Sequence, residues 1–286
     1  MEVSNSIRFS IVVVNYNMGK FLEDALLSVI HQDYPKELIQ LIVIDGGSND
    51  NSMDIIKKHA SFIDYWVSEP DKGQSDAFNK GFKQTNNEWL FWLNADDFLL
   101  KDALKNIASA MKKELRKDRT KQWFCFDSLM TDEKGRCKKA IYGPQWNDFY
   151  LKKIGPVVHS ATTIFHKELY EKSDKFDLHL YWSMDLDLWL QFFTMGNSYR
   201  TLHVFAYAIR ANEQSKTFSE GLKYKPSEER LRQSAYMWSK YMFRPNRIWI
   251  TTWRIHKAFT ISFPVIYYNW RFYNKNLLWW SKPSKE

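Results

Sequence analysis

Apolar residues in the first part of the chain fall into two alternating patterns. Phe9–Val14 is a short, mainly β-branched run in which Ser10 is the one polar residue, whereas between Phe21 and Ile30 the apolar positions recur every three or four residues. The first pattern is typical of a buried strand and the second of an amphipathic helix. The same alternation predicts strands at Leu41–Ile44, Tyr65–Val67 and Trp89–Leu93, and helices ending near Ala60 and covering Asp76–Gln84 and Lys101–Arg116.

Strands that alternate with helices at this spacing predict an α/β fold built on a mostly parallel, doubly wound sheet. Beyond residue 121 the pattern is looser. There we expect an antiparallel pair, Trp123–Phe126 with Ala140–Tyr142, then a strand at Ser160–Phe165, a helix at Leu186–Thr194 and a strand at Tyr199–Ile209. Ligands of such sheets bind outside the carboxyl ends of the strands, so polar clusters at those ends are candidate site residues.

The last quarter of the chain differs from the rest in charge and in aromatic content. Residues 223–286 hold 13 Lys and Arg against 3 Asp and Glu, which gives +10, together with 16 of the 48 aromatic residues. Residues 1–222 hold 28 Lys and Arg against 30 Asp and Glu, which gives −2. We therefore predict an α/β domain at 1–222, with halves at 1–117 and 118–222, and a basic aromatic helical tail at 223–286.

Composition excludes several classes of protein. A content of 44% hydrophobic and 26% charged residues is ordinary for a globular chain and excludes a disordered one. Two cysteines in 286 residues cannot form a disulfide framework, which favours a reducing, cytoplasmic compartment. The first apolar stretch follows Arg8 and is expected to be a strand rather than a signal peptide. No uncharged apolar run approaches the roughly 20 residues of a membrane-spanning helix.

Four polar motifs follow the predicted strands in order. They are Asn15-Tyr16-Asn17, Asp45-Gly46-Gly47, the stretch Asp71-Lys72-Gly73-Gln74 with Asn79 on the next helix, and Asn94-Ala95-Asp96-Asp97. Carboxylates at a strand end suit a hard cation, because Mg²⁺ is usually held by one or two carboxylates plus substrate phosphates. On the local sequence alone, Asp96 and Asp97 fit equally well as caps of the following helix.

The other motifs also have two interpretations. Gly46 and Gly47 let the backbone approach a ligand closely, and they fit a plain turn as well. Asp45 can accept hydrogen bonds from N–H or O–H groups of a ligand. Asn15 can flank a base edge or simply end a strand in solvent, and Lys72 can neutralise a phosphate or be an ordinary exposed lysine.

In their order and content these motifs resemble glycosyltransferase family 2, whose members have the GT-A fold; the resemblance covers roughly residues 8–217. It implies a nucleotide-sugar donor, a divalent metal (Mg²⁺ or Mn²⁺), inversion at the anomeric carbon and a place in bacterial cell-surface polysaccharide assembly. The family's metal motif is Asp-x-Asp, and its first position is Asn94 here, which leaves Asp96 as the main metal ligand, with Asp97 either supporting it at the metal or binding the ribose. The implied nucleotide-sugar site comprises Asn15, Tyr16, Asn17, Asp45, Gly46, Gly47, Lys72, Gly73, Gln74, Asn79, Asn94, Ala95 and Asp96.

The segment from Met184 to Leu190 resembles the family's Glu-Asp-x-Asp-Leu-Trp-Leu, with Met184 in place of the Glu. The match implies that Asp185 is the general base that takes the acceptor's proton, help that is typically worth about 10²–10⁴-fold. The alternative is that Asp185 only meets the helix dipole. Asp187 is the lesser candidate for the base, because positions i and i+2 do not share a helix face.

Two further segments complete the resemblance. His159 and Ser160 match a strand on the family's acceptor side. Arg210, Asn212 and Lys216 match the loop that closes over the diphosphate, where the family commonly has His at the position of Asn212.

We therefore expect a metal-dependent inverting glycosyltransferase that moves a sugar from a UDP sugar to a hydroxyl of a glycan or lipid-linked acceptor. One alternative is a nucleotidyltransferase-like sugar-nucleotide enzyme, although the first loop lacks the Arg/Gly-rich pattern of that class. Another is a non-catalytic basic module that binds nucleic acid through the tail. The acidic strand ends would repel phosphate in such a module, so no nucleic-acid partner is expected.

Tryptophan, tyrosine and basic residues are interleaved along the tail. Such residues favour the headgroup region of an anionic membrane, which predicts a peripheral position on the inner face of the cell membrane. The alternative is that these aromatic residues pack on the domain or form an oligomer interface.

Overall fold

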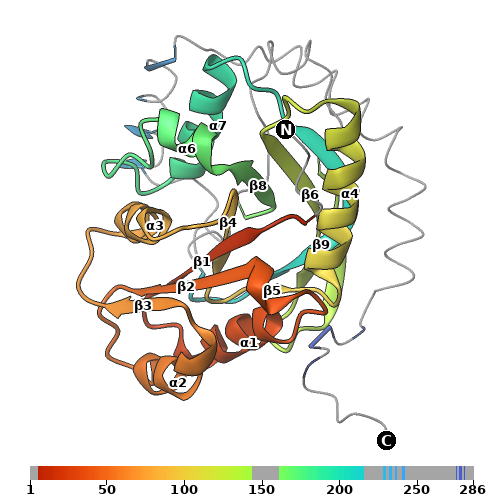
Figure 1. The fold of residues 1–286 in the computed structure, drawn as a ribbon. Coiled ribbons are helices and arrows are strands. Elements are labelled where there is room, and N and C mark those ends of the chain that lie inside the picture. The colour runs from red at the N-terminus through yellow and green to blue at the C-terminus, as the bar shows by residue number, and fades with distance from the viewer. Residues whose placement is uncertain are drawn as a thin grey trace, which may run out of the picture.

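The computed structural model describes residues 6–143 and 161–215, together with positions 228, 229, 232, 233, 236, 240, 241, 275, 277, 278 and 280. These residues build one nine-stranded sheet with helices on both faces (Figure 1). The strands are β1 (Phe9–Asn15), β2 (Ile39–Asp45), β3 (Tyr65–Ser68), β4 (Trp89–Asn94), β5 (Phe98–Leu99), β6 (Trp123–Thr131), β7 (Cys137–Ile141), β8 (Thr163–His166) and β9 (Arg200–Arg210). The helices are α1 (Gly19–Ile30), α2 (Ser52–Lys58), α3 (Gln74–Lys83), α4 (Ala103–Lys117), α6 (Lys167–Lys172) and α7 (Met184–Thr194), with short 3-10 turns η1 (Lys36–Leu38) and η2 (Ala60–Phe62).

The strand order is β3-β2-β1-β4-β8-β6-β9-β5, and β7 pairs with β6. The first four strands are parallel to one another, as the alternation of strands and helices predicts. Their register brings the polar strand ends together, because Asn15 pairs with Asp45, Asp45 with Ser68, and Val14 with Asn94. The sheet therefore gathers the first, second and fourth motifs at one edge.

Two sets of helices cover the sheet (Figure 1). Helices α3, α6 and α7 lie on one side, and α1 and α2 lie on the other. Gly81 allows α3 to approach β1, since a Cβ at this position would lie 2.3 Å from the Val12 side chain. On the same side Trp189 of α7 stacks on Trp92 and Trp123, with ring centroids 5.5 and 5.2 Å apart. Aromatic pairs contribute about 0.5–1.5 kcal/mol each beyond their buried area, so these rings fix α7 on the sheet.

The second half mixes strand directions. An antiparallel hairpin is present as β6 and β7, but its pairing differs from the expected one: residues 128–131 pair with residues 137–141, whereas residues 123–125 pair with β8. Strand β8 is antiparallel to both β4 and β6, while β9 runs parallel to β6. Strand β5 and helix α6, which the pattern did not predict, are two and six residues long. Segments this short contain too few apolar repeats to show a period.

Positions near the end of the chain pack on the body. Cys137 donates its backbone N–H to Lys275 and Leu277 donates to Gly135, both at 2.9 Å, beside the start of β7. Trp280 meets Phe98 edge to face at 5.3 Å in a small second hydrophobic core. Packing on the domain, one of the two expectations for the tail, is therefore found at these positions, and the proposed division of the chain at residue 222 stays a prediction.

Within the described ranges, no helix combines the length and the apolar content that crossing a membrane requires.

Candidate active site

A pocket of about 800 Å³ opens at the carboxyl ends of the parallel strands. Its lining comes from the strand ends and the loops that follow them, from residues 181–185, and from Gln214 and Ser215. Of the expected site residues, this pocket collects Asn15, Tyr16, Gly46, Gly47, Gly73, Gln74, Asn94, Ala95, Asp96 and Asp185.

Asp45 organises the loop between β2 and α2. Its carboxylate is fully buried and accepts four hydrogen bonds, from Asn15 Nδ2, Ser48 Oγ and Ser68 Oγ at 2.6 Å and from Ser48 N at 2.9 Å. Burial opposes ionisation, but these hydrogen bonds outweigh it and lower the pKa of Asp45 below its ordinary value. Asp45 therefore lies behind the pocket wall and holds the loop that forms it, rather than lining the pocket itself.

Two glycines follow Asp45, and both positions are restricted. A Cβ at Gly46 would lie 2.5 Å from the Asp71 carboxylate, and Gly47 has a φ of +78°, which side chains rarely adopt. The backbone can thus approach a ligand closely along this part of the wall.

Asn15 and its neighbours line the base of the same wall. Asn15 donates to Asp45, and its buried Oδ1 has no hydrogen-bond partner among the described residues. Such an atom is costly unless a ligand or a water donates to it. Tyr16 is 62% exposed at the pocket. Asn17 lies outside the lining, where its backbone N–H donates to Ser48 Oγ and its side chain accepts from Asn49 N.

The third motif divides between the pocket and the scaffold. Gly73, at a φ of +106°, precedes α3, and Gln74 donates to Asn94 Oδ1 at 3.3 Å within the pocket wall. Lys72 is exposed and lies outside the lining. Asn79 bonds to the backbone of Phe176 and accepts from Tyr170 OH at 2.8 Å. Asn79 therefore contacts other residues of the protein and does not line the pocket, although the sequence analysis placed it in the nucleotide-sugar site.

The two adjacent carboxylates of the fourth motif have different surroundings. Asp96 lines the pocket, whereas Asp97 is buried and already accepts from Tyr207 OH, Arg210 N and Asn94 Nδ2 at 2.8–3.0 Å. Burial, and next the charge of Asp96, raises the pKa of Asp97. Contrary to the expectation that both bind metal, the Asp97 carboxylate faces protein donors and supports the strand end behind Asp96.

Asn212 lies beside Asp96. Its Nδ2 donates to Asp96 Oδ2 at 2.9 Å, and its own Oδ1 is buried without a hydrogen-bond partner in the described part of the chain. A carboxylate and an amide oxygen are both hard ligands of the kind that Mg²⁺ and Mn²⁺ prefer. The described residues contain no cluster of three His, Cys, Asp or Glu, so a metal here would need oxygen atoms from its substrate as well.

Asp185 lies in the first turn of α7 and lines the pocket. Its Oδ1 accepts the N–H of Leu186 at 2.8 Å. Met184, which occupies the family's Glu position, packs toward α3 and its sulfur lies 3.2 Å from Ser75 Oγ. Asp187 is fully buried away from the pocket, which agrees with its lesser rank as a base.

Arg210 does not reach the pocket. Its guanidinium, 2% exposed, forms an ion pair with Asp24 at 2.8 Å and lies over the rings of Phe21 and Phe98. The expected contact of Arg210 with a diphosphate is therefore replaced by a link between β9 and α1. His159, Ser160 and Lys216 lie outside the described residues.

Residues that the sequence reasoning missed share a property. Asp24, Tyr207 and Gln233 act on the site through a neighbour, and no motif or period marks them.

Comparisons with known proteins identify the class. The sequence model for Glycosyl transferase family 2 matches residues 10–173, more than half of the chain. The poly(ribitol-phosphate) β-N-acetylglucosaminyltransferase TarS of Staphylococcus aureus is 30% identical over 105 residues, 36% of this chain and 18% of TarS. An uncharacterized glycosyltransferase of Rickettsia typhi is 26% identical over 199 residues, 66% of this chain and 60% of the relative. The chain thus spans less than two thirds of either relative.

Solved structures show the same fold. TarS 1–349 in complex with UDP has a TM-score of 0.56 at 17% identity, covering 90% of this chain and 74% of that one. A mannosyltransferase of Pyrobaculum calidifontis in complex with GDP-Man and Mn²⁺ has a TM-score of 0.57 at 16% identity, covering 94% and 80%. The expected GT-A fold is confirmed. The chain belongs to glycosyltransferase family 2, which favours a glycosyltransferase over the alternative of a non-catalytic binding module.

Proposed function

We propose that the protein transfers a sugar, with inversion, from a nucleotide sugar to a hydroxyl of a glycan or lipid-linked acceptor, with Asp185 as general base and Asp96 holding a divalent metal. The observation that carries this proposal is that Asp96, which follows β4, and Asp185, in the first turn of α7, line the same pocket. A donor diphosphate beside Asp96 and an acceptor hydroxyl beside Asp185 would place the sugar between them.

The part of the pocket formed by Asn15, Gly46 and Gly47, here called the donor side, favours a nucleotide as the ligand. The unpartnered Asn15 Oδ1 suits an N–H of a pyrimidine base, and Gly46 and Gly47 leave the wall open to a flat ligand. TarS has been solved with UDP and with UDP-GlcNAc, so we assign a UDP sugar, with an N-acetylhexosamine as the first choice.

The proposed reaction follows from the roles given to Asp96 and Asp185. The acceptor oxygen attacks the anomeric carbon on the face opposite the diphosphate, and its proton passes to a carboxylate oxygen of Asp185. The bond from the anomeric carbon to the diphosphate oxygen breaks, and the nucleoside diphosphate leaves with the electron pair. A divalent cation on Asp96, with Asn212 Oδ1 beside it, would supply charge stabilisation for this leaving group.

The proposal is tested by donor binding and hydrolysis with the full chain. UDP-GlcNAc, UDP-Glc and GDP-Man, each with and without Mn²⁺, are compared by thermal shift, because a ligand that binds only the folded state stabilises it. We expect stabilisation by one UDP sugar that requires the metal. Asp96→Ala should lower metal-dependent hydrolysis by about 10²–10³-fold, whereas Asp64→Asn, an exposed carboxylate away from the pocket, should not change it. Full activity in excess EDTA would refute the metal.

The membrane-surface location is a second part of the proposal, and it rests on the composition of the tail. Truncation is a poor test, because it also removes Leu277, Leu278 and Trp280 from the second core. Substituting Trp249, Trp253 and Trp270 with Ala in the full chain avoids that loss, and these positions lie outside the described residues. We expect weaker sedimentation with anionic vesicles and unchanged nucleotide affinity. If the intact protein does not sediment with vesicles at low salt, the location is wrong.

A further inference from the structure

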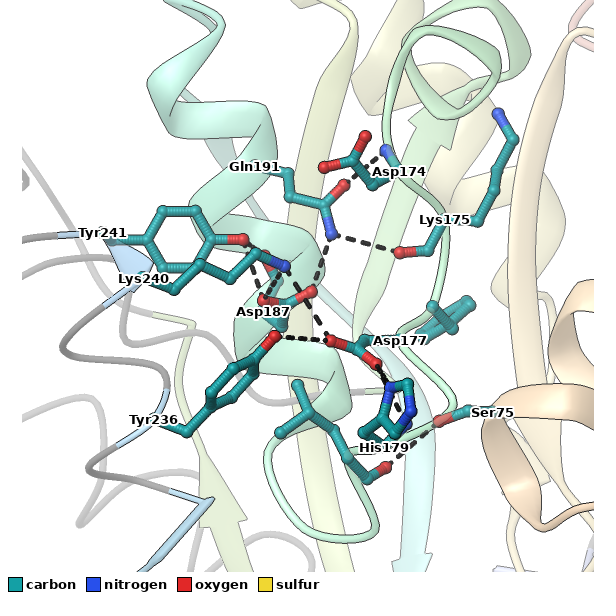
Figure 2. A network of polar contacts seen from close by, with 12 residues as sticks. Ser75, Asp174, Lys175, Asp177, His179, Asp187, Gln191, Tyr236, Lys240 and Tyr241 are labelled. Atoms are coloured by element: carbon teal, nitrogen blue, oxygen red, sulfur yellow. Dashed lines mark hydrogen bonds and ion pairs between the residues drawn. The ribbon is translucent and has the colours of Figure 1, made fainter.

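The buried carboxylate of Asp187, which the proposed reaction does not use, links α7 to residues near the end of the chain (Figure 2). Its Oδ1 accepts from Lys240 Nζ at 3.0 Å and from Tyr241 OH at 2.8 Å, and its Oδ2 accepts from Gln191 Nε2 at 2.7 Å. A fully buried carboxylate is stable only when it is paired and hydrogen-bonded, and Lys240 supplies the opposite charge. Burial opposes the charge of Lys240, yet the hydrogen bond and charge of Asp187 raise the pKa of that lysine.

Two more C-terminal residues contact the same stretch of chain. Gln233 Oε1 accepts the backbone N–H of Trp182 at 2.7 Å, and Tyr236 OH donates to Asp177 at 3.2 Å. Gln233, Tyr236 and Lys240 each have helical backbone geometry, and the side chains of all three contact the segment from residue 177 to residue 187. We call Gln233, Tyr236, Lys240 and Tyr241 the C-terminal clamp.

The clamp holds the wall of the pocket that contains Asp185. Its contacts fall on residues 177, 182 and 187, and residues 181–185 between them line the pocket. Within this stretch Ser183 has a φ of +50°, a left-handed conformation that a non-glycine residue keeps only where its surroundings hold it. The backbone of Trp182 is fixed on one side of Ser183 and the side chain of Asp187 on the other.

We infer that the C-terminal clamp is a positioning device for the acceptor-side wall: Lys240, Tyr241 and Gln233 fix the segment from Trp182 to Asp187 and thereby set the position of Asp185. This inference rests on the proposed function, in which Asp185 takes the acceptor's proton. The donor-side wall is held by its own hydrogen bonds among Asn15, Asp45 and Ser48. Disturbing the clamp should therefore reduce turnover while nucleotide affinity stays unchanged.

The test compares four full-length variants. Lys240→Met leaves Asp187 buried without its countercharge, and Lys240→Arg keeps the charge. The double variant Lys240→Met with Asp187→Asn removes both charges. Arg232→Met is the matched control, because it breaks an exposed ion pair with Glu228 in the same region.

Four quantities are measured for each variant: Tm, UDP affinity in the presence of Mn²⁺, turnover, and hydrogen exchange of residues 177–187. We expect Lys240→Met to lower Tm, to speed exchange in that segment and to reduce turnover by about 10- to 100-fold, with UDP affinity within about twofold of wild type. Lys240→Arg should retain most activity. The double variant should recover Tm, because replacing a buried ion pair is often neutral, but its turnover should stay low.

The outcomes separate the two claims. If turnover in the double variant returns to the wild-type value together with Tm, the clamp contributes only stability and the inference is overturned. Unchanged exchange of residues 177–187 in Lys240→Met would overturn it as well. If the wild-type protein binds no nucleotide, the proposed function fails, whereas the exchange measurement still reports on the clamp.

Discussion

Replacing Asp45 with Asn is a sharp test of how the donor-side wall is built. The amide has the same shape, but one carboxylate oxygen becomes an NH₂ group that donates rather than accepts. In one orientation of the substituted side chain, its new NH₂ group takes the place of Oδ1. It then faces two groups that cannot accept from it: Asn15 Nδ2, which is itself a donor, and the Ser48 hydroxyl, which already accepts from Asn17 N and Asn15 Nδ2. If Nδ2 replaces Oδ2, the Ser68 hydroxyl can rotate to accept, but the backbone N–H of Ser48 loses its acceptor. The second orientation therefore costs less.

The magnitude follows from that orientation. One buried N–H without an acceptor costs about 1–3 kcal/mol, and the three remaining hydrogen bonds lose the strength that the charge gave them. A neutral amide costs less free energy to bury than a charged carboxylate, and this difference offsets part of the lost stability. We expect the free energy of unfolding to fall by about 2–4 kcal/mol at pH 7. Nucleotide affinity should fall too, because Gly46 and Gly47 of the same loop line the pocket.

The assay is urea unfolding of the full chain, with the loss taken from the shift in midpoint at constant slope. Asp64→Asn is the matched control, since that exposed carboxylate accepts one hydrogen bond, from Leu41 N, which an amide oxygen can also accept. Because the pKa of Asp45 is lowered on folding, its contribution is present above about pH 4 and is lost as the pH falls through the folded-state pKa. The gap between Asp45→Asn and wild type should therefore narrow in acid. A loss below about 1 kcal/mol at pH 7, or one equal to that of the control, would refute the reasoning.

Three further predictions concern other parts of the molecule. Burial raises the pKa of Asp127 from 3.8 to about 7, so the folded state retains a proton that the unfolded chain releases, and stability falls as the pH rises between these values. Asp127→Asn should accordingly stabilise the protein by about 1–4 kcal/mol at pH 8 and hardly at pH 4; equal effects at the two pH values in urea unfolding would contradict this. Asp185→Asn should keep UDP affinity and lose about 10²-fold or more in turnover in a steady-state assay, and a fully active variant would remove Asp185 as the base. Trp280→Ala should lower stability by about 1–3 kcal/mol through the lost contact with Phe98, whereas an unchanged midpoint would mean that this end of the chain is not docked.

The first half of the fold was predictable because its elements are long and periodic. A buried strand such as Phe9–Asn15 contains a run of four β-branched apolar residues, and parallel strands bring their carboxyl ends to one edge, so the motif order alone indicated the pocket. The resemblance to the family then distinguished Asp185 from Asp187, and the burial of Asp187 is consistent with that ranking.

The pairing of charges was not predictable, because periodicity carries no information on which distant side chains meet. Arg210 finds Asp24 at a separation of 186 residues, and Asp97 finds Tyr207 at a separation of 110. Asp24 and Tyr207 thus each contact a residue, Arg210 or Asp97, that the sequence analysis placed at the site itself. Short elements were missed for a different reason, since a two-residue strand such as Phe98–Leu99 is defined by its partner in β9 and not by its own pattern.

The pairing of Asp187 with Lys240 also has a consequence for how the protein is made. The two residues are 53 positions apart, and Lys240 is synthesised after the whole of α7 and β9. At a synthesis rate of about 5–20 residues per second, Lys240 is added roughly 3–10 s after Asp187, and until then the Asp187 carboxylate has no lysine to pair with. During that interval burial of the Asp187 carboxylate is disfavoured, which delays closure of the acceptor side until the C-terminal residues have been translated. A product terminated before residue 240 would therefore carry an assembled donor half and an unfinished catalytic wall.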